Sequence, residues 1–81
     1  MTEISKEAIE DFLGMEVEVT ERYHAYEYTV TADHNPWDLL KEVRDRFGIC
    51  GYSISHYETA FIFEEEGNIY ELIVKHPEKK N

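Results

Sequence analysis

The sequence is poor in cysteine, in long apolar runs and in positive charge. Cys50 is the single cysteine among 81 residues, so no intramolecular disulfide can form and the framework of a small secreted protein is excluded. No apolar run approaches the roughly 18–20 residues that a membrane-spanning helix needs. Residues 1–4 contain no basic segment followed by an apolar stretch, so no signal peptide is predicted. We expect a cytoplasmic protein that is not bound to a membrane, in the host-cell cytoplasm if a phage encodes it.

Basic residues are too few to balance the acidic ones. The chain has 8 Lys and Arg against 18 Asp and Glu, which gives a net charge of −10. Such a molecule repels nucleic acid, so direct binding to DNA or RNA is disfavoured and a basic protein is the favoured partner. The excess is uneven, because residues 36–47 are neutral and residues 75–81 are positive, so residues 1–35 and 48–74 carry all of it.

Aromatic residues, by contrast, are plentiful. Six Tyr, four Phe and one Trp are enough to anchor a small core, since each buries about 150–250 Å². The length allows one domain. We expect residues 1–76 to form a single acidic α+β domain and residues 77–81 to form a polar tail.

Two helices are predicted from capping residues and apolar spacing. Residues 5–13 begin at Ser5, a good N-cap, and place their apolar side chains on one face. Residues 36–47 begin after Asn35, with Pro36 at the first helical position, and carry a second apolar stripe. A glycine follows each segment and ends the helix.

Alternating or apolar segments predict five strands, with a turn at Gly67-Asn68. These segments are residues 15–21, 24–32, 52–57, 60–65 and 69–75. The element order is therefore α-β-β-α-β-β-β. We expect a single antiparallel sheet of about five strands with both helices on one face, since two isolated hairpins would not be stable in water.

Alternation also assigns the acidic residues to a face. With the apolar side chains toward the helices, five glutamates point away from them: Glu16, Glu18, Glu27, Glu64 and Glu71. The hairpin registers that we expect place Glu18 opposite Glu27 and Glu64 opposite Glu71. Like charges in such positions destabilise a sheet, so the face is either spread in solvent or used in binding.

The first functional hypothesis is a non-enzymatic inhibitor that occupies the basic nucleic-acid-binding surface of a partner, such as a nuclease. Acidic phage anti-defence proteins, including anti-CRISPR proteins, have this general profile, an analogy of class and not of sequence. Its candidate binding residues are the acidic face, the run beside the turn and one exposed tyrosine: Glu16, Glu18, Glu27, Glu64, Glu65, Glu66, Glu71 and Tyr57. A face that only keeps the protein soluble explains the same pattern.

The second hypothesis is a structural or regulatory homo-oligomer without nucleic-acid mimicry. Phe61 and Phe63 lie on one face of the last predicted hairpin, and Ile62 and Ile73 lie on the other. Because both faces are apolar, either another part of the chain or a second copy covers one of them. A homodimer is therefore a real alternative to a monomer.

The third hypothesis is a small enzyme that uses a carboxylate pair or the neighbourhood of Cys50 and His56. No motif supports it, since no two of the four histidines have metal-ligand spacing and no phosphate-binding loop is present. A reactive cysteine also needs an electropositive setting, which this chain lacks. We assign no catalytic residue, no metal ligand and no cofactor.

Overall fold

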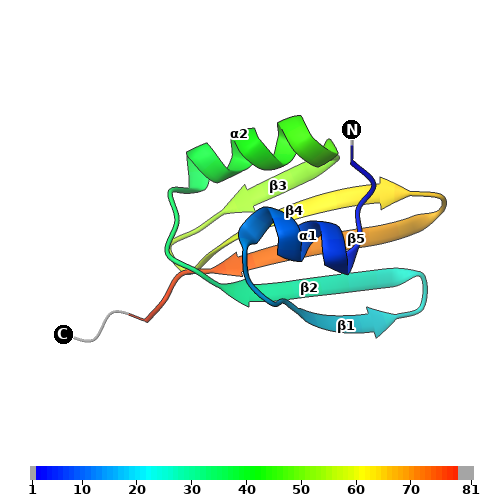
Figure 1. Ribbon diagram of the computed structural model, residues 1–81, viewed down its shortest axis with the longest axis horizontal. Coiled ribbons are helices and arrows are strands. Elements are labelled where there is room, and N and C mark those ends of the chain that lie inside the picture. The colour runs from blue at the N-terminus through cyan, green and yellow to red at the C-terminus, as the bar shows by residue number, and fades with distance from the viewer. Residues whose placement is uncertain (1, 79–81) are drawn as a thin grey trace.

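The computed structural model describes residues 2–78, which form two helices and one five-stranded sheet (Figure 1). In chain order the elements are α1 (Lys6–Leu13), β1 (Glu18–Arg22), β2 (Ala25–Thr31), α2 (Pro36–Phe47), β3 (Gly51–Ile54), β4 (Glu58–Glu65) and β5 (Asn68–Lys75). This α+β order is the one that the sequence predicts. Neither helix is long and apolar enough to cross a membrane. Of the predicted polar tail, residues 79–81 lie outside the described residues.

The sheet is mixed, so the prediction of a wholly antiparallel sheet is wrong. The strand order is β1-β2-β5-β4-β3, and β2 pairs with β5 in parallel while the other three pairs are antiparallel. The reason lies in α2, which returns the chain so that β3 runs in the same direction as β2. Two hairpins then reverse the chain twice, so β5 also runs in the direction of β2.

The helix ends follow the local chemistry of the sequence. The Ser5 hydroxyl accepts a hydrogen bond of 3.1 Å from the Ala8 amide, and the Asn35 side chain accepts from the amides of Trp37 and Asp38. Gly14 ends α1 in the left-handed region, with φ 72°. Ser5 and Asn35 thereby satisfy amides that have no partner inside the helix, and the Gly14 amide donates to the Glu10 carbonyl at the other end of α1.

Both helices pack against the same face of the sheet, as predicted (Figure 1). The core is a cluster of apolar side chains from α1, α2 and the three central strands, including Ile9, Val43, Phe61, Leu72 and Val74. These five side chains are almost fully enclosed. Because successive strand residues point to opposite faces, the alternate residues of β2, β4 and β5 point away from the helices.

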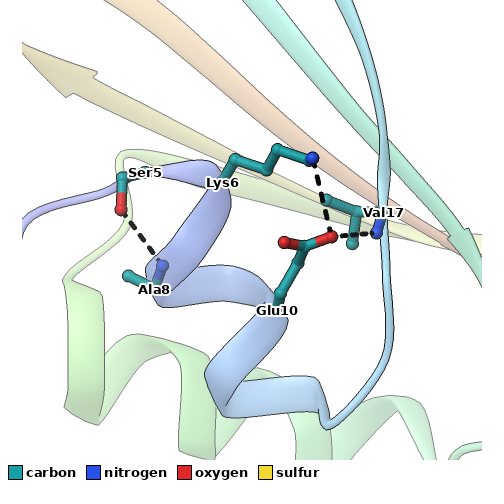
Figure 2. A network of polar contacts seen from close by, with 5 residues as sticks. All are labelled: Ser5, Lys6, Ala8, Glu10 and Val17. Atoms are coloured by element: carbon teal, nitrogen blue, oxygen red, sulfur yellow. Dashed lines mark hydrogen bonds and ion pairs between the residues drawn. The ribbon is translucent and has the colours of Figure 1, made fainter.

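Carboxylates hold α1 in place. Glu10 Oε2 accepts a hydrogen bond of 2.9 Å from the Val17 amide, and Lys6 Nζ lies 3.9 Å from the same oxygen (Figure 2). Glu65 Oε2 accepts a hydrogen bond of 3.2 Å from the Ile4 amide, just before the helix. These contacts connect α1 to the beginning of β1 and to the end of β4.

The registers of both hairpins differ from the predicted ones by two residues. Glu18 lies opposite Thr29, and Glu64 lies opposite Ile69. The turns are responsible, because the second hairpin turns at Glu66-Gly67, where φ is 50° and 81°. Left-handed backbone at both turn residues is typical of tight hairpins, and glycine adopts it without strain. A slip of two residues keeps every side chain on its face but changes its partner.

Candidate protein-binding surface

No described element covers the sheet face opposite the helices, which we call the open face. Its residues follow from the strand registers. They are Glu18, Thr20 and Arg22 of β1; Ala25, Glu27, Thr29 and Thr31 of β2; Ile69, Glu71, Ile73 and Lys75 of β5; Glu58, Ala60, Ile62 and Glu64 of β4; and Gly51 and Ser53 of β3. Five of these residues are acidic and two are basic, so the face is negative.

Four of the glutamates that the sequence singles out lie on this face: Glu18, Glu27, Glu64 and Glu71. A fifth glutamate of this face is Glu58. The sequence predicts that the strand begins at Ala60, but β4 begins two residues earlier, at Glu58. Its position has the same alternation as Ile62 and Glu64, and that signal identifies it once the strand is extended.

The centre of the open face is a pair of glutamates that the predicted registers do not contain. Glu27 and Glu71 lie directly opposite each other in the parallel pairing of β2 and β5. The predicted pairs, Glu18 with Glu27 and Glu64 with Glu71, do not exist. Both members of the observed pair are half-buried, and Ile62 flanks Glu71 on its other side.

This setting raises the pKa of the Glu71 carboxyl above its ordinary value. Partial burial is the largest cause, and the negative charges of Glu27 and Glu58 add to it. Arg22 acts in the opposite direction and lowers the pKa of Glu71, without removing the increase. The pair is therefore a site where a further positive charge is electrostatically favourable.

Apolar side chains surround the pair. Ile62 and Ile73 are half-buried and Ile69 is 41% exposed. Together with Arg22 and the two glutamates, Ile62 and Ile69 line a hollow of about 150 Å³. Such a hollow admits the end of one side chain. Apolar contact beside unneutralised carboxylates is a combination that favours a protein partner with basic and apolar side chains.

The other predicted binding residues lie elsewhere. Glu16 is exposed and precedes β1, and Glu66 is in the turn between β4 and β5. Glu65 is half-buried on the helix side, where it accepts the hydrogen bond from Ile4. Tyr57, in the loop between β3 and β4, is 80% exposed. Glu16, Glu66 and Tyr57 therefore remain as separate exposed groups outside the open face.

The residues considered for chemistry do not converge. Cys50 is exposed and precedes β3, whereas His56 follows it, so the extended strand separates them. Within residues 2–78, no three His, Cys, Asp or Glu side chains lie close enough to hold a metal ion.

Two histidines that the sequence does not indicate as neighbours lie together in the structure. The His34 and His76 rings stack with centroids 4.1 Å apart. His34 Nδ1 donates to the Ala32 carbonyl at 2.8 Å, and its Nε2 lies 2.9 Å from the buried Thr59 hydroxyl. Because both nitrogens of His34 have partners, this ring joins the end of β2 to β4, and no spacing rule reveals such a contact.

Comparisons of the chain with protein-family models, with curated proteins and with solved structures find no match. The residues of the open face are therefore interpreted from their own chemistry.

Proposed function

We propose that this protein is a non-enzymatic, acidic inhibitor whose open face occupies the basic nucleic-acid-binding surface of a partner protein. The observation that carries the proposal is the Glu27–Glu71 pair, half-buried among isoleucines at the centre of a negative face. The face would present carboxylates where the partner normally meets phosphates, as phage anti-defence proteins of the mimicry class do.

The physical reason is the state of the pair in the free protein. The raised pKa of Glu71 means that its charged form is disfavoured there. An Arg or Lys side chain from a partner would neutralise both carboxylates and relieve that repulsion. Arginine fits best, because its planar guanidinium can meet two carboxylates at once. The isoleucines around the pair exclude water from the contact.

The experiment compares two variants with equal net charge. The face variant carries E18Q, E27Q, E64Q and E71Q, and the matched variant carries E3Q, E42Q, D45N and E78Q at exposed positions outside the open face. Immobilised wild-type protein captures binders from a lysate, and each captured protein is purified and titrated with both variants. We expect the face variant to bind at least about tenfold more weakly than wild type, whereas the matched variant binds nearly as wild type does.

Two further measurements are specific to mimicry. A DNA or RNA duplex added in excess should displace the protein from its partner, and affinity should fall steeply with salt. Failure of the nucleic acid to compete, or an equal loss in both variants, contradicts the proposal. Binding that does not change with salt contradicts it as well.

A second copy of the chain is the other candidate for the open face, since Ile62, Ile69 and Ile73 are uncovered. Self-association would bring Glu27 and Glu71 of two copies toward each other, which costs free energy at neutral pH. Sedimentation velocity at micromolar concentration separates the two candidates. If the wild-type protein is a dimer and the I62D variant is a monomer, the homo-oligomer is favoured. If the wild-type protein is a monomer, the inhibitor is favoured.

A further inference from the structure

The helix side of the sheet has its own uncovered region, beside β1. Helix α1 lies over the central strands, and β1 forms the lower edge of the sheet beyond it (Figure 1). Between the first turn of α1 and β1 lies an open groove of about 620 Å³. Val17, Val19 and three tyrosines, Tyr26, Tyr28 and Tyr70, line it. The sequence contains six tyrosines, but no local pattern indicates that three of them lie together here.

The three tyrosines form a stack. The Tyr26 and Tyr70 rings are 5.1 Å apart with an interplanar angle of 13°, and the Tyr28 and Tyr70 rings are 6.4 Å apart with an angle of 6°. Tyr28 is buried, yet its hydroxyl forms no hydrogen bond with any residue that the structure describes and is not sealed from solvent. The groove thus offers nearly parallel aromatic rings and an available phenol.

Two carboxylates flank the rings. Glu7, in the first turn of α1, is close enough to Tyr28 to raise the pKa of its phenol, after the larger effects of burial and Tyr70. Glu21 lies opposite Tyr26 in the register of β1 and β2, so it shares the helix side of the sheet. Neither carboxylate forms an ion pair with a residue in the range 2–78.

The one cation of the groove is already engaged. Lys6 lines the groove, but its ammonium lies beside Glu10, which also receives the Val17 amide (Figure 2). This arrangement leaves Glu7 and Glu21 facing solvent beside the tyrosines. Anionic ligands are excluded by charge, and a purely apolar ligand would bury both carboxylates unpaired.

We propose that this groove binds an arginine side chain of a protein partner, with the guanidinium stacked on the tyrosines and hydrogen-bonded to Glu7 or Glu21. A guanidinium is planar and stacks on aromatic faces, and its five donors match carboxylate oxygens and a phenol. The valines, Val17 and Val19, provide an apolar surface for its methylene stem. The groove and the open face lie on opposite faces of the sheet, so this proposal does not depend on the proposed function.

The test is a titration of ¹⁵N-labelled full-length protein with three capped tripeptides, acetyl-Gly-X-Gly-amide, in which X is arginine, citrulline or lysine. Citrulline keeps the shape of arginine but has no charge. We expect saturable shifts of the Tyr26, Tyr28 and Tyr70 amides with the arginine peptide, and binding about tenfold weaker with citrulline. The lysine peptide should bind with intermediate affinity, because its ammonium has the positive charge but not the planar shape of a guanidinium.

Three double variants locate the binding. The E7Q/E21Q variant should bind the arginine peptide about tenfold more weakly than wild type. The E3Q/E42Q variant, which has the same net charge, should bind it as wild type does. E27Q/E71Q on the open face should leave this binding unchanged, which separates failure of the groove from failure of the proposed function. Equal binding of citrulline, shifts confined to the open face, or no saturable shift at all would each overturn the proposal.

Discussion

Glu71 concentrates the electrostatic cost of the open face in one carboxyl. Its raised pKa means that the folded state holds the Glu71 proton more tightly than the unfolded state, where the pKa is near the ordinary value of 4.5. The contribution of this group to stability is therefore fully present below pH 4.5 and is lost as the pH rises through the raised pKa. At neutral pH the charged carboxyl opposes folding.

The E71Q variant should consequently be more stable than wild type at neutral pH. Removing one of two facing like charges should raise the free energy of unfolding by about 0.5 kcal/mol. The gain should shrink when the pH is lowered below 4.5, where wild-type Glu71 is protonated. Urea unfolding followed by circular dichroism at both pH values measures the difference.

Glu64→Gln is the control for this prediction, because Glu64 is an exposed glutamate of the same face that lies opposite an isoleucine. We expect a smaller change in the free energy of unfolding at neutral pH. If E64Q stabilises the protein as much as E71Q does, then overall charge and not the Glu27–Glu71 pair is responsible.

Alternation placed four of the five glutamates on the correct face and failed for Glu16, which precedes β1, and it did not identify the neighbours of any of them. Glu27 and Glu71 are each on the predicted side of the sheet. Their pairing depends on β2 lying parallel to β5, a contact between segments more than forty residues apart in sequence. No local pattern contains that information, so the centre of the candidate site was not predictable.

Among the elements, the turn between β4 and β5 shows how one glycine sets a register. Gly67 has φ 81°, and a Cβ atom added there would meet no atom within 4 Å. The G67A variant should therefore lose stability through backbone strain alone, by about 1 kcal/mol. In the opposite direction, E66N should gain about 0.5 kcal/mol, because Asn-Gly is the preferred pair for a tight hairpin turn. Thermal and urea unfolding measure both changes.

Gly51 is the matched control for G67A. It also has open space around its Cα, but its backbone is in a region that any residue adopts. G51A should be neutral or slightly stabilising, since alanine reduces the freedom of the unfolded chain. A loss in G51A equal to that in G67A would show that φ is not the cause.

The elements themselves were largely predictable, and their ends less so. Ser5, Asn35 and the following glycines carry enough local chemistry to fix both helices. The turn was expected at Gly67-Asn68, one residue too late, because the sequence does not show whether glycine takes the first or second turn position. That single step shifted the predicted register by two residues.

For the whole molecule, the net charge is the dominant property. A charge of −10 on 81 residues repels itself, and within residues 2–78 only two ion pairs compensate it, Lys6 with Glu10 and Arg46 with Asp11. The second is 3.4 Å long and exposed, so it contributes little. The total charge was evident from the sequence, whereas the part of it that lies on the open face and the part that lies in the groove beside β1 required the fold.

Salt should therefore stabilise this protein, because repulsion between its carboxylates outweighs the attraction within its ion pairs, and salt screens both. When NaCl is raised from about 0.01 M to about 0.1 M, the Debye length falls from about 30 Å to about 10 Å, and we expect the melting temperature to rise by about 5 °C. Differential scanning calorimetry measures the change. The E18Q/E27Q/E64Q/E71Q and E3Q/E42Q/D45N/E78Q variants, each with four fewer acidic residues, should show a smaller rise than wild type. A melting temperature that falls with salt would mean that attractive pairs, and not the excess of carboxylates, dominate the electrostatics of the folded state.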